Sequence, residues 1–325
     1  MSIRENIRKI AEYKKSHPEK GALMKKICSA LKIRLCYLGI SFLYIFIRPE
    51  LNKEQSDRII NWKWYVYLKR KYRKMLNELP EYKVPENATI PKIIWWCWLQ
   101  GEEKAPALCR ACLNSIRRNM SDYQVNIVTE ENMWSFISVP DFIRDKYEKG
   151  IIPRTQFSDL LRTCLLIEHG GIWMDSTVLC TGNIPVGLFE RQFFIFQNYK
   201  RGDESCCLSS WLIAACAAEP SLIMTRDLLF AYWKKTNYLC HYFIYHFFFT
   251  MVCEKYPTVL KSLPRYSNLP PHILQFEMFE KFDNIRWKQI KDMSPFHKLN
   301  WKYDTKSIDI TGTYYEHILT VYGEF

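Results

Sequence analysis

The side chains best suited to chemistry lie in residues 157–177, FSDLLRTCLLIEHGGIWMDST. Asp159 and Arg162 are three residues apart, so a helix places them side by side on one of its faces. Asp175 directly follows three apolar residues, where a carboxylate is costly unless it is solvated, paired or bound to a metal. If the chain turns between these positions, the three groups meet at one corner, where they could bind a polar ligand together.

The elements that must position these groups are a helix, a glycine turn and a strand. Leucine, cysteine and isoleucine recur at helical spacing between residues 160 and 167, and Ser158 is expected to cap the start of this helix. Gly170 and Gly171 end it, one of them in the left-handed conformation that other residues resist. Residues 172–174 are too few for a helix and too apolar for a loop, which indicates a buried strand.

Simpler explanations exist for the same residues. Asp159 and Arg162 could form a surface ion pair, which contributes about 0–1 kcal/mol to stability. Asp175 could cap the turn that follows it. What speaks against these explanations is the ordered set of Ser-Asp-x-x-Arg, Gly-Gly, three apolar residues and Asp-x-Thr.

This ordered set resembles the core of glycosyltransferases with the GT-A fold. It is most similar to the capsular polysaccharide synthesis proteins, and then to mannosyltransferases and large clostridial glucosylating toxins that share S-D-x-x-R…G-G-x-x-x-D-x-D. Further similar segments are IPKIIWW at residues 90–96, WLIAA at 211–215, YW at 232–233, YFIYH at 242–246 and FHKLNWK at 296–302. The resemblance covers residues 88–303.

The resemblance implies transfer of a sugar from a nucleotide sugar, with a UDP-sugar as the expected donor, to a glycan or lipid-linked acceptor. The reaction would retain the anomeric configuration and serve capsular or surface polysaccharide synthesis. Asp159, Arg162 and Asp175 match the positions that act on the donor. Donor binding is also expected from Ser158, Ser176, Thr177 and Lys298, and from Trp95 or Trp96, of which alternation along a strand buries one.

The implied cofactor is Mn²⁺ or Mg²⁺, held by Asp175, Thr177 and His297. Thr177 stands where the family pattern has its second acidic residue. Because a hydroxyl is a weaker ligand for a hard cation than a carboxylate, the sequence leaves dependence on a metal open. The same substitution supports the alternative function, a non-catalytic scaffold subunit of a membrane polysaccharide-assembly complex.

Composition and charge narrow the classes of partner. The net charge is +12, and much of the excess lies before residue 75, which suggests an anionic partner. No zinc-finger spacing or other nucleic-acid module occurs, so nucleic acid is not an expected partner. Cys109 and Cys112 form a lone C-x-x-C without a second metal-spaced pair, which favours reduced thiols in a cytosolic protein over a zinc site.

The chain divides by sequence into a basic helical region, residues 1–87, and a catalytic domain, residues 88–325. Residues 35–47 are apolar but fewer than the about 20 that a spanning helix needs. We therefore expect residues 1–50 to lie on an anionic membrane surface, on its cytoplasmic face, as a peripheral or monotopic anchor. The alternative is a hydrophobic helix packed against the catalytic domain or a partner chain.

The order of elements predicts the fold class. Strands are expected at residues 92–98, 124–129, 172–174 and 193–198, with helices at 107–119, 131–137, 140–149, 222–233 and 238–254. This alternation predicts an α/β fold with a mixed, mainly parallel sheet flanked by helices, preceded by an N-terminal helical extension. Ligands of such sheets bind at the carboxyl ends of the strands.

Overall fold

The computed structural model describes residues 53–198, 203–303 and 308–323. The chain divides into two compact units. The smaller contains residues 1–73 and 201–205, and the larger contains residues 74–200 and 206–325. In the smaller unit, the described helix α4 (Lys53–Lys71) ends in three basic residues, Lys69–Lys71. The expected membrane anchor, residues 1–50, lies outside the described residues.

The larger unit is built around a five-stranded sheet in the order β2-β1-β3-β6-β5. Its strands are β1 (Ile93–Cys97), β2 (Gln124–Val128), β3 (Gly171–Met174), β5 (Phe193–Gln197) and β6 (Leu208–Ala215). β1 pairs in parallel with both β2 and β3, whereas β6 runs antiparallel to its neighbours β3 and β5. Four strands thus share one direction, which confirms the predicted α/β fold with a mainly parallel sheet.

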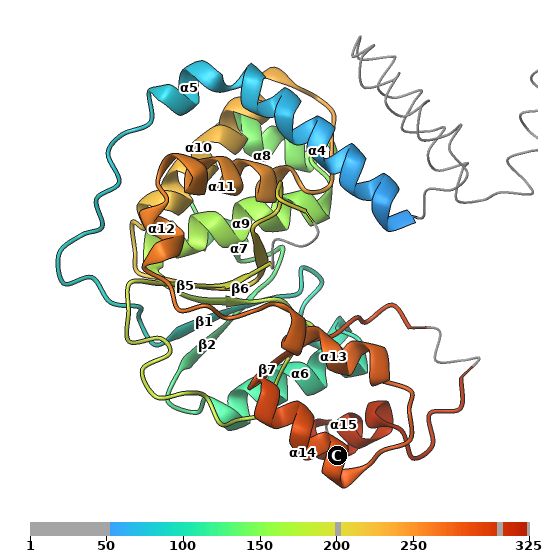
Figure 1. Ribbon diagram of the computed structural model, residues 1–325. Helices are drawn as coiled ribbons and strands as arrows, with labels where there is room; N and C mark the ends of the chain where they lie inside the picture. The colour runs from blue at the N-terminus through green and yellow to red at the C-terminus, as the bar shows by residue number, and fades with distance from the viewer. Residues whose placement is uncertain (1–52, 199–202, 304–307, 324–325) are drawn as a thin grey trace, which may run out of the picture. The chain divides into compact units, whose positions relative to one another are not determined.

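Helices cover both faces of this sheet (Figure 1). On one side lie α8 (Asp141–Glu148), α9 (Arg154–His169), α10 (Pro220–Lys235) and α11 (Ile244–Lys255). On the other lie α6 (Ala107–Asn119), α13 (Leu269–Glu277), α14 (Asn284–Met293) and α15 (Tyr314–Tyr322). The remaining described helices are short: α5 (Arg73–Asn77), α7 (Met133–Phe136), α12 (Thr258–Lys261) and the 3₁₀ turn Glu102–Lys104.

A second, two-stranded sheet joins distant parts of the larger unit. β4 (Val178–Cys180) follows β3 closely, and β7 (Phe296–Lys298) pairs with it in antiparallel register. Phe296 and Cys180 belong to the core that packs against the main sheet, whereas Leu179 belongs to a second core with α6, α13, α14 and α15. The two faces of this small sheet therefore point into different surroundings.

The glycine turn between α9 and β3 forms as the sequence predicts. Gly170 and Gly171 have φ values of 68° and 98°, a region that favours glycine. A Cβ atom on Gly171 would lie 2.6 Å from the main-chain oxygen of Ile93 on the neighbouring strand. The second glycine thus lets β3 approach β1 closely, and Asp175 follows at the carboxyl end of β3.

Most of the predicted elements occur close to their predicted bounds, but several details differ. α11 begins at Ile244 rather than at residue 238, and strands β4, β6 and β7 were not predicted as strands. The predicted cap at Ser158 is wrong, because α9 already begins at Arg154 after Pro153. Ser158 lies inside the helix, and its hydroxyl donates to the main-chain oxygen of Thr155. The thiols of Cys109 and Cys112 are buried in the core, as expected.

Residues 74–87 are tied to the helical layer of the larger unit. The Lys255 ammonium donates to the main-chain oxygens of Leu76 and Asn77 at 2.6 and 2.9 Å. The Tyr82 hydroxyl donates to the buried Glu219 carboxylate at 3.0 Å. The boundary predicted between residues 87 and 88 consequently lies within this unit.

Candidate functional site

Three polar side chains of α9 and β3 meet at the carboxyl end of the central strand. The Arg162 guanidinium lies 3.4 Å from Asp159 Oδ1 on the same helix and 3.6 Å from Asp175 Oδ1 after β3. Trp173 supports the guanidinium, whose central carbon lies 5.0 Å from the centre of the indole ring. The structure therefore brings together the Asp159, Arg162 and Asp175 side chains that the sequence singled out.

The main chain fixes this arrangement. Arg162 Nε and Nη1 donate to the carbonyl oxygens of Ser158 and Ser210, at 3.1 and 2.5 Å. Asp175 donates its main-chain N–H to the carbonyl of Trp211 at 2.9 Å. Because Ser210 and Trp211 both lie in β6, one strand sets the position of the cation and of its carboxylate partner.

The two carboxyl groups of the site differ in their affinity for protons. Burial raises the pKa of Asp159 to about 7, with Asp175 adding to the rise and Arg162 opposing it. Burial acts in the same direction on Asp175, but Lys298, Arg162 and the hydrogen bond from Trp173 together hold its pKa below the ordinary value. Near neutral pH, Asp175 is the fixed anion of the site, and Asp159 can take up a proton.

Lys298 joins the site from the C-terminal part of the chain. Its ammonium lies 3.3 Å from Asp175 Oδ2 and donates to Thr177 Oγ1 at 2.5 Å. Pairing of Val178 with Lys298, and the bond from Leu299 N–H to the Thr177 carbonyl at 2.9 Å, hold the two segments in register. The Lys298 side chain keeps 23% of its surface exposed, so a ligand can reach it.

His297 does not face this cluster, and the expectation that it joins Asp175 and Thr177 as a metal ligand is wrong for this arrangement. It neighbours Lys298 on β7, so its side chain points to the opposite face of the small sheet. There it is fully buried beside Trp287, and its Nε2 lies 3.2 Å from Thr181 Oγ1. Burial lowers its pKa to about 3.

The remaining oxygen donors do not fit a resident Mn²⁺ or Mg²⁺. Asp175 Oδ1 accepts from Trp173 Nε1 at 2.9 Å and faces Arg162, while Oδ2 and the Thr177 hydroxyl both face Lys298. Mg²⁺ requires about six oxygen ligands in octahedral geometry. The described residues contain no group of three or more His, Cys, Asp or Glu side chains that could hold a metal ion.

Trp95 and Trp96 are both in the core, which contradicts the expectation that one of them stacks on a nucleotide base. Their exposed fractions are 2% and 0%, and Trp95 Nε1 donates to the Gly170 carbonyl at 2.9 Å. Both faces of β1 are covered by helices, so alternation leaves neither side chain free. The sequence interpretation did not single out two other tryptophans, Trp98 just beyond β1 and Trp301, which is 42% exposed; their ring centres lie 5.5 Å apart.

Other residues that the sequence suggested for ligand binding interact with neighbouring parts of the chain instead. The Ser176 hydroxyl acts to lower the pKa of the Cys109 thiol of α6, which burial raises, and the Ser158 hydroxyl accepts a hydrogen bond from the Arg162 guanidinium at 3.3 Å. Gln156, considered for sugar binding, is buried and donates to the Tyr242 carbonyl. Asn198, considered for the same role, donates to the carbonyls of Cys206 and Leu208.

His246 is close to the cluster, although its aromatic surroundings in the sequence favoured a place in the core. The charges of Arg162 and Asp175 both act on the pKa of its imidazole ring. The His246 Nδ1 atom is buried and has no hydrogen-bond partner in the described structure. Burial, with the nearby Arg162, lowers its pKa to about 3, so the ring is neutral. The sequence pointed to this region only through the family-like segment YFIYH at residues 242–246. The packing of α11 is what brings His246 near α9.

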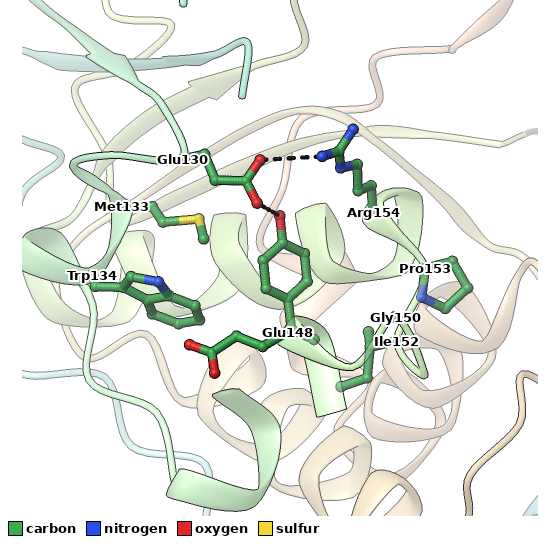
Figure 2. Close-up of a pocket in the computed structure, with 9 residues that line it drawn as sticks. Glu130, Met133, Trp134, Glu148, Gly150, Ile152, Pro153 and Arg154 are labelled. Carbon is green, nitrogen blue, oxygen red and sulfur yellow. Dashed lines mark hydrogen bonds and ion pairs between the residues drawn. The ribbon is translucent and has the colours of Figure 1, made fainter. Parts of the chain in front are cut away.

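A cavity of about 600 Å³ opens at the start of α9 (Figure 2). Glu130 lies on its wall, accepts from the Tyr147 hydroxyl at 2.9 Å and pairs with Arg154 at 3.3 Å. Trp134 forms another wall, with Arg144 over its ring at 4.6 Å. Of α9, only Arg154 lines the cavity, and Arg162 lies about two helical turns further along the same helix.

Comparison with known proteins places the chain in a family. The sequence profile of the capsular polysaccharide synthesis proteins matches residues 45–318, and the chain belongs to this family. An uncharacterized glycosyltransferase of Acanthamoeba polyphaga mimivirus is 26% identical over 118 residues, 34% of this chain. The chain thus matches 44% of that relative's length. Among solved structures, PaToxG glycosyltransferase is similar with a TM-score of 0.40 and 14% identity, over 82% of this chain and 98% of the other.

Proposed function

We propose that this protein is a glycosyltransferase of the GT-A type, which moves a sugar from a nucleotide sugar, with a UDP-sugar as the expected donor, to a glycan or lipid-linked acceptor. The observation that supports this most is the meeting of Arg162, Lys298 and Asp175 at the carboxyl end of β3. Two cations can neutralise a diphosphate there, and Asp175 holds both in position.

The nucleotide end of the donor is assigned to Trp98 and Trp301. Trp301 lies three residues after Lys298, and Trp98 follows β1, the strand that pairs with β3. An exposed indole offers a flat face on which a base can stack beside the phosphate-binding lysine. The sugar would then lie toward Asp159, whose carboxyl group can donate or accept a hydrogen bond, and toward the neutral His246.

The acceptor glycan is assigned to the cavity beside Trp134. Its wall carries carboxylates from Glu130 and Glu148 and the Arg154 guanidinium, which suit hydroxyl groups better than an apolar base. A glycan array probed with the full chain and with Arg154→Ala tests this assignment. Loss of glycan binding in the variant, with nucleotide binding intact, is expected; equal array profiles would contradict it.

The reaction proposed is transfer with retention of configuration, in the synthesis of capsular or other surface polysaccharide. Membership of the capsular polysaccharide synthesis family supports the pathway, and the order of the motifs supports retention. In such a reaction the released phosphate can itself accept the acceptor's proton. Proton NMR of the fresh product distinguishes retention from inversion.

A donor screen tests the function itself. The full chain is titrated calorimetrically with UDP-, GDP-, dTDP- and CMP-linked sugars, with Mn²⁺ and with EDTA, and Asp175→Ala serves as the site variant. We expect one nucleotide class to bind and the variant to lose that binding. If no nucleotide sugar binds and Asp175→Ala behaves as the wild type, the enzyme proposal is wrong and the scaffold alternative is favoured.

Membrane attachment through residues 1–50 is proposed on sequence grounds. These residues combine an apolar run with basic flanks, as interfacial anchors do. None of the described helices is long and apolar enough to cross a membrane. Flotation with anionic liposomes should carry the full chain and not a variant without residues 1–50; equal flotation of both would contradict the anchor.

A further inference from the structure

The Lys298 ammonium lies against both polar side chains of the Asp-x-Thr turn. It contacts the two side chains that bracket the turn after β3, Asp175 at 3.3 Å and Thr177 at 2.5 Å. These are the positions from which the D-x-D pattern of similar enzymes offers oxygen to a metal. In this chain the second of them is a hydroxyl, and it accepts a hydrogen bond from a cation of the protein itself.

The main chain holds Lys298 in place. Lys298 pairs with Val178 in the β4–β7 sheet, and the Leu299 N–H donates to the Thr177 carbonyl. The turn is closed by the bond from Val178 N–H to the Asp175 carbonyl at 2.9 Å. Backbone pairing therefore holds the base of the Lys298 side chain next to the turn that carries Asp175 and Thr177, which favours both contacts of its ammonium.

The charges agree with this assignment. Lys298 and Arg162 face different oxygens of Asp175, and their nearness helps hold its pKa below the ordinary value. A bound divalent ion would have to displace the ammonium from Asp175 Oδ2 and from the Thr177 hydroxyl. A diphosphate, in contrast, can bind to the exposed side of the ammonium and leave both contacts in place.

We propose that the Lys298 ammonium replaces the divalent cation in this site, so that the nucleotide donor binds and reacts without a metal. This inference rests on the proposed function. In the transfer, the bond between the anomeric carbon and the phosphate oxygen breaks, and its electron pair leaves with the diphosphate. The anomeric carbon bonds to the acceptor oxygen, and the acceptor's proton passes to the released phosphate. Lys298 neutralises the charge that accumulates on the diphosphate.

The test compares binding with and without metal, independently of turnover. The full chain is titrated calorimetrically with UDP, GDP and inorganic pyrophosphate, in EDTA and in Mn²⁺, and Mn²⁺ binding is followed by electron paramagnetic resonance. We expect the same dissociation constant within about twofold in both buffers, and no nucleotide-dependent Mn²⁺ binding. Lys298→Met should weaken binding at least tenfold, which corresponds to about 1.4 kcal/mol, whereas Lys298→Arg should retain part of it.

Two further variants sharpen the result. Lys288→Met removes an exposed lysine of α14 and should bind like the wild type. The double variant Thr177→Asp, Lys298→Ala restores a second carboxylate and removes the ammonium. It should acquire Mn²⁺ binding and require Mn²⁺ to bind nucleotide.

The outcomes separate this inference from the function on which it rests. Nucleotide binding by the wild type in Mn²⁺ but not in EDTA would overturn the lysine substitution and leave the glycosyltransferase proposal intact. Unchanged nucleotide binding in Lys298→Met would overturn it as well. Binding of no nucleotide or pyrophosphate in either buffer would contradict both proposals together.

Discussion

The Arg162 guanidinium donates to the main-chain carbonyl of Ser210 at 2.5 Å and so ties helix α9 to strand β6. The same guanidinium lies between the carboxylates of Asp159 and Asp175. Because a guanidinium presents several donors in one plane, it can bond to the main chain and pair with carboxylates at once. Arg162 thus serves both the architecture of the site and its charge.

Arg162→Lys should therefore reduce both donor affinity and thermal stability, although the substitution keeps the positive charge. A lysine ammonium cannot reach Ser210, Asp159 and Asp175 together, so we expect donor affinity to fall at least tenfold and the melting temperature to decrease. Calorimetric titration and thermal unfolding measure the two effects. The matched control is Arg226→Lys, at a partly exposed pair with Asp227, which should change neither quantity. Equal donor affinity in Arg162→Lys and wild type would contradict this role.

Asp159 should make stability dependent on pH. Its pKa in the folded chain is about 7, above its ordinary value, so the folded state holds the proton more tightly than the unfolded state. The stability from this proton is complete below the ordinary carboxyl pKa and is lost as the pH rises through about 7. Relative to Asp159→Asn, the wild type should lose on the order of 3 kcal/mol of unfolding free energy between pH 5 and pH 8.

Urea unfolding of both proteins at several pH values measures this loss. Asp159→Asn cannot ionise at this position, so its stability serves as the reference at each pH. A constant difference between the two proteins over this range would show that the Asp159 carboxyl group keeps an ordinary pKa.

Gly171→Ala should disrupt the close pairing of β3 with β1. A Cβ at this position would come within 2.6 Å of the Ile93 carbonyl, in a backbone conformation that alanine resists. The matched control is Gly150→Ala, which has φ of 67° and no atom within 4 Å of the added Cβ. Backbone strain should lower the free energy of unfolding of the control by about 1–2 kcal/mol. Gly171→Ala should lower it considerably more, because its Cβ also clashes with Ile93. Similar melting temperatures for the two variants would mean that β3 can move away from Ile93 at little cost.

Trp301→Ala tests the assignment of the nucleotide base. Stacking of an aromatic side chain on a base contributes about 1–3 kcal/mol. We therefore expect the variant to bind the nucleotide-sugar donor, UDP-linked or otherwise, at least fivefold more weakly. Trp301→Phe should retain most of it, because the flat face remains. Phe276→Ala, a highly exposed aromatic residue of α13, provides the control and should bind the donor as the wild type does. Inorganic pyrophosphate, which has no base, should bind all three variants equally.

The sequence alone determined the local parts of this protein. Helical spacing placed Asp159 beside Arg162, the glycine pair predicted the turn, and the apolar run predicted the strand that ends at Asp175. These features depend on neighbours within a few residues, whose geometry is fixed by the repeat of a helix or strand. The alternation of such elements also sufficed to predict a mainly parallel sheet covered by helices.

Only the tertiary structure decided which distant groups meet. It buried Trp95 and Trp96 together, because helices cover both faces of β1, and it turned His297 away because neighbours on a strand point in opposite directions. It also placed Lys298 against Asp175 and Thr177, through a pairing of β4 with β7 across more than a hundred residues of chain. No short-range pattern specifies such a pairing, since it is selected by the packing of two separate cores around the small sheet.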